Sequence, residues 1–183
     1  MSELHSVAAR MVAKGKGILA ADESTPTCTK RFESINTEST EQSRNFYRNM
    51  LFTSDNIAEY INGIILFDET FHQKEFKTDT LFPQYLESKS ILPGIKVDGG
   101  LQSFNNHPQE KVTVGLDGLD ERLSRYYSLG ARFAKWRAVI TLGDGIPSDG
   151  CIQANAEGLA KYALLCQQAN LVPIVEPEVL MDG

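Results

Sequence analysis

The amino-acid sequence predicts an α/β protein with a parallel sheet. Five short apolar segments alternate with segments of helical periodicity, at residues 18–21, 61–67, 91–97, 131–140 and 171–175. This alternation is typical of βαβ units rather than hairpins, and apolar residues on both strand faces indicate a sheet covered by helices. An ionisable residue lies at or near the end of every strand: Asp22, Asp68, Lys96, Lys135 and Glu176. In a barrel of parallel strands, that end carries the active site.

An amphipathic helix is predicted over residues 4–12, because its apolar residues recur at i, i+3, i+4 and i+7. Strand 18–21 follows and closes on Asp22. The next residues are predicted to form a polar βα loop suited to binding an anion. Its candidate ligands are Ser24, Thr27, Lys30 and Arg31.

A second helix is predicted over residues 40–60, since the polar residues 36–40 can cap its start. The side chains expected to face the core are Phe46, Tyr47, Met50 and Leu51. Strand 61–67 follows, and Gly63 within it predicts the close approach of a neighbouring group.

The middle and end of the chain vary in the strength of their patterns. Residues 71–90 have weak periodicity and are predicted as loop with irregular helix, and 105–111 as polar loop. Helices are predicted over 116–129 and 152–169 from apolar recurrence every three to four residues. Strand 171–175 is predicted to end before Pro177. Pro173 fits a central strand poorly, because proline donates no ladder hydrogen bond.

Strand 131–140 carries a lysine in an apolar setting. Alternation places one set of side chains on each face: Phe133, Lys135 and Arg137 on one, Ala134, Trp136 and Ala138 on the other. An ammonium group buried there must be paired or have a lowered pKa. The alternative is that Lys135 reaches solvent from a strand end. Its place in a series of ionisable strand ends favours a functional role.

Composition excludes several classes of protein. With 183 residues, 42% hydrophobic and 23% charged, the chain is long enough for one folded domain and is not typical of disorder. A net charge of −6 disfavours nonspecific nucleic-acid binding, and neither a signal-peptide pattern nor a membrane-length apolar run occurs. The histidines and cysteines lack zinc-ligand spacing. Three cysteines without a CxxC pair favour a reduced intracellular setting.

The sequence predicts two lysines and two or three carboxylates at one barrel mouth. Each carboxylate there would favour the protonated form of the lysines, whereas burial and the second lysine would oppose it. Such a site can shuttle protons beside a carbonyl group. Lys96, with the hydroxyls of Ser24 and Thr27, is available for a phosphate.

Five segments then carry a resemblance to class I fructose-1,6-bisphosphate aldolase. They are GKGILAADES (15–24), GIKVD (94–98), LDGL-ER (116–122), G-RFAKWR (130–137) and VPIVEPE (172–178). The resemblance runs along almost the whole chain. It implies a TIM (β/α)8 barrel, of which residues 1–183 would be the N-terminal part of a single domain, with an N-terminal helix and five of the strands. It also implies a cytoplasmic glycolytic lyase, usually a homotetramer, that uses no metal or cofactor.

The resemblance implies roles by position. Asp22 would handle the C4 hydroxyl proton, Lys135 would support C–C cleavage and the carbinolamine steps, and Glu176 would be the principal proton acceptor and donor. Arg137 and Glu178 would shape the charge around Glu176. The residues implied to contact phosphate or hydroxyl groups of fructose 1,6-bisphosphate and the triose phosphates are Ser24, Thr27, Arg31, Arg44 and Lys96. Asp68 stands where the family commonly has histidine, and is assigned no role.

One departure bears on activity. The family forms its Schiff base on a lysine in a segment like LLKP, and these 183 residues contain no such segment. Five strands also cannot close an eight-stranded barrel. The expectation is an N-terminal half of an aldolase that is inactive alone. Two alternatives stay open: a non-catalytic half-barrel that binds sugar phosphate or serves as a scaffold, and a different lyase that uses Lys135 as its nucleophile.

Overall fold

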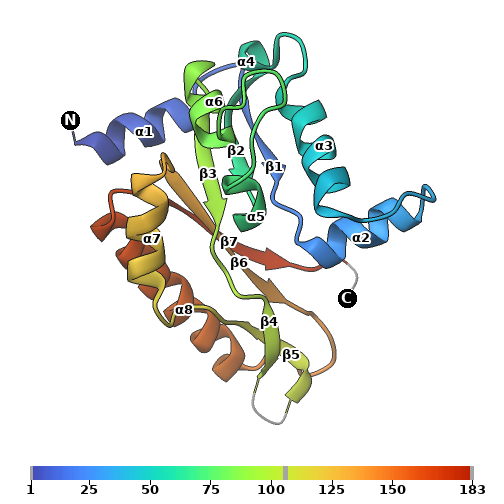
Figure 1. The fold of residues 1–183 in the computed structure, drawn as a ribbon. Coiled ribbons are helices and arrows are strands. Elements are labelled where there is room, and N and C mark those ends of the chain that lie inside the picture. The colour runs from blue at the N-terminus through green and yellow to red at the C-terminus, as the bar shows by residue number, and fades with distance from the viewer. Residues whose placement is uncertain (1, 105–106, 182–183) are drawn as a thin grey trace.

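The computed structural model describes residues 2–104 and 107–181, and its centre is a parallel sheet. The five strands follow one another in the order β1-β2-β3-β6-β7, so each strand pairs with the one before it, as successive barrel strands do (Figure 1). Their bounds are Gly17–Ala21 (β1), Ile61–Leu66 (β2), Leu92–Lys96 (β3), Phe133–Ile140 (β6) and Val172–Val179 (β7). The predicted parallel α/β class is confirmed.

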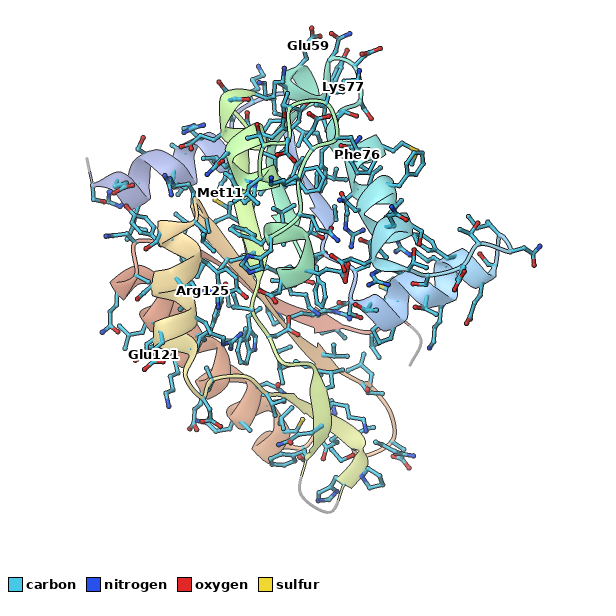
Figure 2. All side chains as sticks on the ribbon, viewed as in Figure 1. Met11, Glu59, Phe76, Lys77, Glu121 and Arg125 are labelled. Atoms are coloured by element: carbon cyan, nitrogen blue, oxygen red, sulfur yellow. The ribbon has the colours of Figure 1, made fainter. Side chains whose placement is uncertain are left out.

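Eight helices are formed by the described residues. They are α1 (Glu3–Met11), α2 (Thr25–Glu33), α3 (Glu41–Phe52), α4 (Ile57–Tyr60), α5 (Asp68–Phe71), α6 (Phe82–Ser88), α7 (Leu119–Ser128) and α8 (Asp149–Gln168). The larger apolar cluster joins buried residues of α3, α5, α6, α7 and α8 to one face of the sheet, here called the outer face. Glu121 and Arg125 project from α7 away from this core (Figure 2).

Helix α1 packs on the opposite, inner face. Its buried Val7 and Met11 join Ile65, Leu92 and Phe133 in a second apolar cluster, and α1 lies toward the amino-terminal ends of the strands (Figure 1). The two faces of β6 divide as predicted, with Phe133 in the inner cluster and Ala134, Trp136 and Ala138 in the outer one. The inner face is therefore apolar at the amino end and free for polar side chains at the carboxyl end.

Two glycines make room for the Phe133 ring on the inner face. A Cβ atom on Gly63 would lie 3.1 Å from that ring, which confirms the close approach predicted there. At Gly94, a Cβ atom would lie only 2.2 Å from the ring. The strand pair β2–β3 thus has a groove that only glycine permits.

Several predicted elements differ from the structure. The predicted polar loop after Asp22 is helix α2, which starts at Thr25 with proline in its first turn, a position that proline favours. The predicted helix 40–60 breaks into α3 and α4, because Asn56 takes a left-handed conformation (φ 58°). In α3 the buried residues are Arg48 and Phe52, whereas Phe46 and Met50 are exposed.

A second sheet lies where residues 105–111 were predicted as a polar loop. Strands β4 (Leu101–Phe104) and β5 (His107–Thr113) form an antiparallel pair, and the pair lies beyond the carboxyl end of β3 (Figure 1). Residues 105 and 106 are outside the described part of the chain. The β5 segment HPQEKVT is mostly polar and lacks the apolar alternation from which a strand is predicted. In the structure, only Glu110 of its seven residues is buried.

Strand β7 runs to Val179, past its predicted end, and contains both prolines. Val172 donates its N–H to the carbonyl of Arg132, just before β6, and Leu180, just after β7, donates its N–H to the carbonyl of Ile140 at the end of β6. Alternation along the strand therefore turns positions 173 and 177 away from β6, toward the sheet edge. Proline is tolerated there because, in the described part of the chain, β7 is the last strand of the sheet and its outward N–H groups have no strand to pair with.

The three cysteines are free thiols and are buried. In residues 2–104 and 107–181, no helix is both long enough and apolar enough to span a membrane.

Candidate functional site

The site is centred on Lys135, in the middle of β6. Its Nζ lies 3.3 Å from Asp22 Oδ2 and 3.3 Å from Glu176 Oε2. The side chains of Lys135 and Asp22 are 12% and 11% exposed, and that of Glu176 is 31% exposed. We call these three residues, with Arg137 and Glu178, the inner-face cluster.

The contact between Asp22 and Lys135 requires a curled sheet. Asp22 follows β1, which is three strands away from β6, a distance of about 14 Å on a flat sheet. A hydrogen bond of 3.3 Å between the two side chains is possible because the inner face is concave. The five strands thus form a curled half-barrel, and its curvature brings together residues that are 113 positions apart in the sequence.

Lys135 is held as a cation. Burial opposes the ammonium form, but attraction to Asp22 and Glu176 and hydrogen bonds to both outweigh it, so the pKa of Lys135 is raised above its ordinary value. Of the two ways to accommodate a buried lysine, the structure uses pairing and not a lowered pKa. A protonated Lys135 can donate a proton or stabilise an oxyanion, but it is not a nucleophile in this state.

Arg137 and Glu178 continue the cluster toward the strand end. The Arg137 guanidinium donates to Glu178 and lies 4.0 Å from Glu176. This bond lowers the pKa of Glu178 and raises that of Arg137. The pair keeps a fixed cation beside Glu176.

Lys96 lies on the neighbouring strand, level with Lys135 in the β3–β6 register. Its Nζ is 3.5 Å from Oδ1 of Asp98, whose side chain is 5% exposed. No functional role was assigned to Asp98 from the sequence, so this pairing was not predicted. The signal was available, because Lys96 and Asp98 are two residues apart at a strand end and therefore share a face.

The hydroxyls of Ser24 and Thr27 meet at the start of α2. Their oxygens are 3.0 Å apart, and Ser24 is the N-cap of the helix without bonding its backbone N–H groups through its side chain. The N–H groups of a first helical turn favour an anion. The two hydroxyls lie at that turn, two and five residues after Asp22 in the sequence.

Two predicted ligands have other partners. Arg31, 57% exposed, pairs with Glu23. The Arg44 guanidinium contacts both carboxylate oxygens of Glu69 and also donates to Ser39. The structure therefore brings Asp22, Lys135, Glu176, Arg137 and Glu178 together, but engages Arg31 and Arg44 elsewhere.

Asp68 also lies apart from the cluster. Its Oδ1 accepts a hydrogen bond of 2.6 Å from the hydroxyl of Tyr126 on α7, and Asp68 begins helix α5. Its position at a strand end is explained by these structural contacts.

The inner-face cluster has the groups that a proton relay requires. One ammonium group touches two carboxylates, that of Asp22 just after β1 and that of Glu176 on β7. A proton can therefore pass between groups on either side of a small molecule seated over β6. The adjacent Lys96 and the first turn of α2 offer donors for an anionic group. A phosphorylated carbonyl compound or polyol has both features.

Comparison with known proteins identifies the same family along the whole chain. The family model described as fructose-bisphosphate aldolase class-I matches residues 3–183. The probable fructose-bisphosphate aldolase class 1 of Xanthomonas campestris is 55% identical over 183 residues, which are 100% of this chain and 54% of that protein. Cytosolic fructose-bisphosphate aldolase 4 of Arabidopsis thaliana is 52% identical over 181 residues, 99% of this chain and 46% of its own.

A solved structure is similar in fold. The fructose-bisphosphate aldolase of Plasmodium falciparum, in a ternary crystal structure with TRAP and a small-molecule inhibitor, superposes with a TM-score of 0.95 at 49% identity. The match covers 99% of this chain and 52% of that one. The present chain thus spans about half the length of the relatives it matches.

Proposed function

Because this chain belongs to the class I fructose-bisphosphate aldolase family, we propose that the inner-face cluster is part of an active site for aldol cleavage. The reaction is the reversible conversion of fructose 1,6-bisphosphate to dihydroxyacetone phosphate and glyceraldehyde 3-phosphate. The observation that carries the proposal is the Lys135 ammonium group held 3.3 Å from both Asp22 and Glu176.

The proposed roles are those that the family resemblance implies, and the charges of the inner-face cluster support them. In cleavage, the C4 hydroxyl loses its proton as the C3–C4 bond breaks, and the electron pair of that bond is taken up by an iminium group at C2, the Schiff base that the family forms on a lysine of an LLKP-like segment. Asp22 is proposed to accept the C4 proton, as the resemblance implies, and Lys135 keeps its carboxylate ionised and oriented in the site. Lys135 stabilises negative charge on a substrate oxygen and donates protons in the carbinolamine steps. Glu176 returns and removes protons, and Arg137 with Glu178 sets the charge around it.

The phosphate and hydroxyl groups of the sugar are proposed to bind Ser24, Thr27 and Lys96. Arg31 and Arg44 are further proposed contacts, and each would first exchange its carboxylate partner, Glu23 or Glu69, for the ligand. Calorimetric titration with fructose 1,6-bisphosphate tests this set. Lys96→Met is expected to weaken binding at least about tenfold, the scale of one charge-assisted contact. Lys89→Met, an exposed lysine on the outer side, serves as the matched control.

We also propose that this chain alone does not form the Schiff base. The 183 residues contain no LLKP-like segment, and Lys135 is held protonated by its carboxylates. Treatment with dihydroxyacetone phosphate and borohydride, followed by peptide mass mapping, is expected to leave Lys135 and Lys96 unmodified. A stable adduct on Lys135 would instead support a lyase that uses Lys135 as its nucleophile.

A half-barrel that binds sugar phosphate without turnover is the second candidate. The arrangement of Ser24 and Thr27 at the first turn of α2 favours it, because these groups are suited to binding whether or not cleavage follows. Binding without release of triose phosphate would support this candidate, and absence of binding would contradict it. We also propose that the family member to which these residues belong is cytoplasmic and forms a homotetramer. Light scattering after gel filtration would test the homotetramer by measuring the molar mass.

A further inference from the structure

Glu23 lies between two site residues, Asp22 and Ser24, but its side chain does not contact the inner-face cluster. It turns toward α3, where its Oε2 lies 2.7 Å from Nη1 of Arg48. The side chains are 10% and 3% exposed. The two atoms form an ion pair but lie outside hydrogen-bond geometry. A carboxylate directly beside the site is thus paired with an arginine buried beneath it.

Arg48 also binds the main chain of the same residue. Its Nη2 donates to the carbonyl oxygen of Glu23 at 2.9 Å and lies 3.6 Å from the Cys28 sulfur. The preceding residue, Tyr47, donates its hydroxyl to Glu23 Oε1 at 3.0 Å, and the Arg48 guanidinium lies 5.0 Å over the Tyr47 ring. Glu23 is therefore held through both its side chain and its backbone by one turn of α3.

The second cation on Glu23 has a different character. Arg31 contacts Oε1 from α2, but its side chain is 57% exposed, so solvent competes for it. Arg48 occupies a core-facing position of α3, four residues before the buried Phe52. An apolar pair at such a place often stabilises a fold as well as a buried ion pair does. The planar guanidinium is suited to binding a carboxylate and a carbonyl at once, which an apolar residue cannot do.

We propose that Arg48 is a positioning residue, which holds residues 22–24 through Glu23 so that Asp22 stays against Lys135 and Ser24 stays against Thr27. The catalytic meaning of this contact rests on the proposed function, whereas the geometric claim can be tested without turnover. Asp22 has no helix or strand of its own, because β1 ends at Ala21 and α2 begins at Thr25. The bonds from Arg48 supply the anchor that secondary structure does not.

The test measures the Asp22–Lys135 contact in the 183-residue chain. The Lys135 Cε signal, assigned with a Lys135→Arg variant, is followed by carbon-13 NMR as pH is raised. In Arg48→Met the Lys135 titration midpoint is expected to fall, because Asp22 is no longer held beside it. Amide exchange at residues 23–28 is expected to accelerate about two- to tenfold, the factor for one net hydrogen bond. Arg48→Lys should give an intermediate result, since it keeps the charge but lacks the planar fork.

Two further variants separate positioning from stability. Arg48→Met combined with Glu23→Gln leaves no unpaired buried charge, and is expected to recover stability while the lower Lys135 midpoint persists. Glu69→Gln breaks another arginine–carboxylate pair of α3, with Arg44, and is expected to leave the Lys135 titration unchanged. A wild-type midpoint in both Arg48 variants would overturn the proposal. Failure of the wild-type chain to bind fructose 1,6-bisphosphate would instead count against the proposed function and leave these NMR results standing.

Discussion

The Lys135 ammonium group offers a direct measure of how the inner face is stabilised. We consider Lys135→Met, which removes the ammonium group and leaves an unbranched apolar side chain one atom shorter than that of lysine. Each contact of 3.3 Å corresponds to about 5 kcal/mol of attraction at an effective dielectric constant of about 20. Removing the ions from water costs several kcal/mol per ion and offsets most of the total.

The net effect is set by what the substitution leaves behind. Without the ammonium, two carboxylates face each other, and loss of one partner from a buried pair costs about 3–5 kcal/mol. Glu176 is 31% exposed and can regain water, so we expect a loss of about 2–3 kcal/mol in the free energy of unfolding at pH 7. Urea unfolding followed by circular dichroism measures it. Lys89→Met removes only a surface contact with the Tyr85 ring and should change the free energy by no more than about 1 kcal/mol.

The same substitution has a signature in pH. The pKa of Lys135 is raised in the folded state. Its contribution to stability is therefore fully present below the unfolded lysine pKa of about 10.4, and is lost as pH rises through the higher folded pKa. The stability difference between wild type and Lys135→Met should be constant from pH 7 to about 10 and shrink above about 10.4. Equal stabilities at pH 7, or a difference that persists at high pH, would refute the reasoning.

Three other substitutions test the packing around the site, each by urea unfolding. Gly94→Ala places a methyl group 2.2 Å from the buried Phe133 ring and should cost about 1–3 kcal/mol; a neutral result would mean that the ring can move. Ser148→Ala removes the N-cap of α8 and should cost about 1 kcal/mol, with Ser148→Asn as the conservative comparison. Thr113→Val deletes a hydrogen bond of 2.7 Å to the Arg137 carbonyl and should cost about 1 kcal/mol, unless β5 is held to β6 by other contacts alone.

Much of the site could be predicted because strand patterns act locally. The faces of β6 follow from alternation, so the sequence alone groups Phe133, Lys135 and Arg137 correctly on one side of the strand. The pairing of Lys96 with Asp98 could have been found in the same way. The placement of Ser24 and Thr27 at a helix start could also have been found, since Pro26 is typical of a first helical turn.

Other features depend on contacts between distant segments. The apolar residues of α3 suggested a stripe through Phe46 and Met50, yet the structure buries Arg48 and Phe52. A periodicity argument assigns apolar side chains to the buried face of a helix. It cannot predict that Arg48 is buried, because the carboxylate that pairs with it comes from Glu23, in a distant segment of the chain. The β4–β5 pair was missed for a related reason, because its strands lie mostly at the surface and lack an apolar face.

Sequence patterns alone were enough to predict the parallel α/β class and the two faces of strand β6. These properties depend on the alternation of apolar and polar residues within single segments. Three features emerge only from the folded structure: Asp22 touches Lys135 across the curled sheet, β7 is an edge among the described strands and therefore tolerates Pro173 and Pro177, and the buried Arg48 pairs with Glu23. Curvature, strand neighbours and the pairing of buried charges arise from segments that meet only when the chain folds.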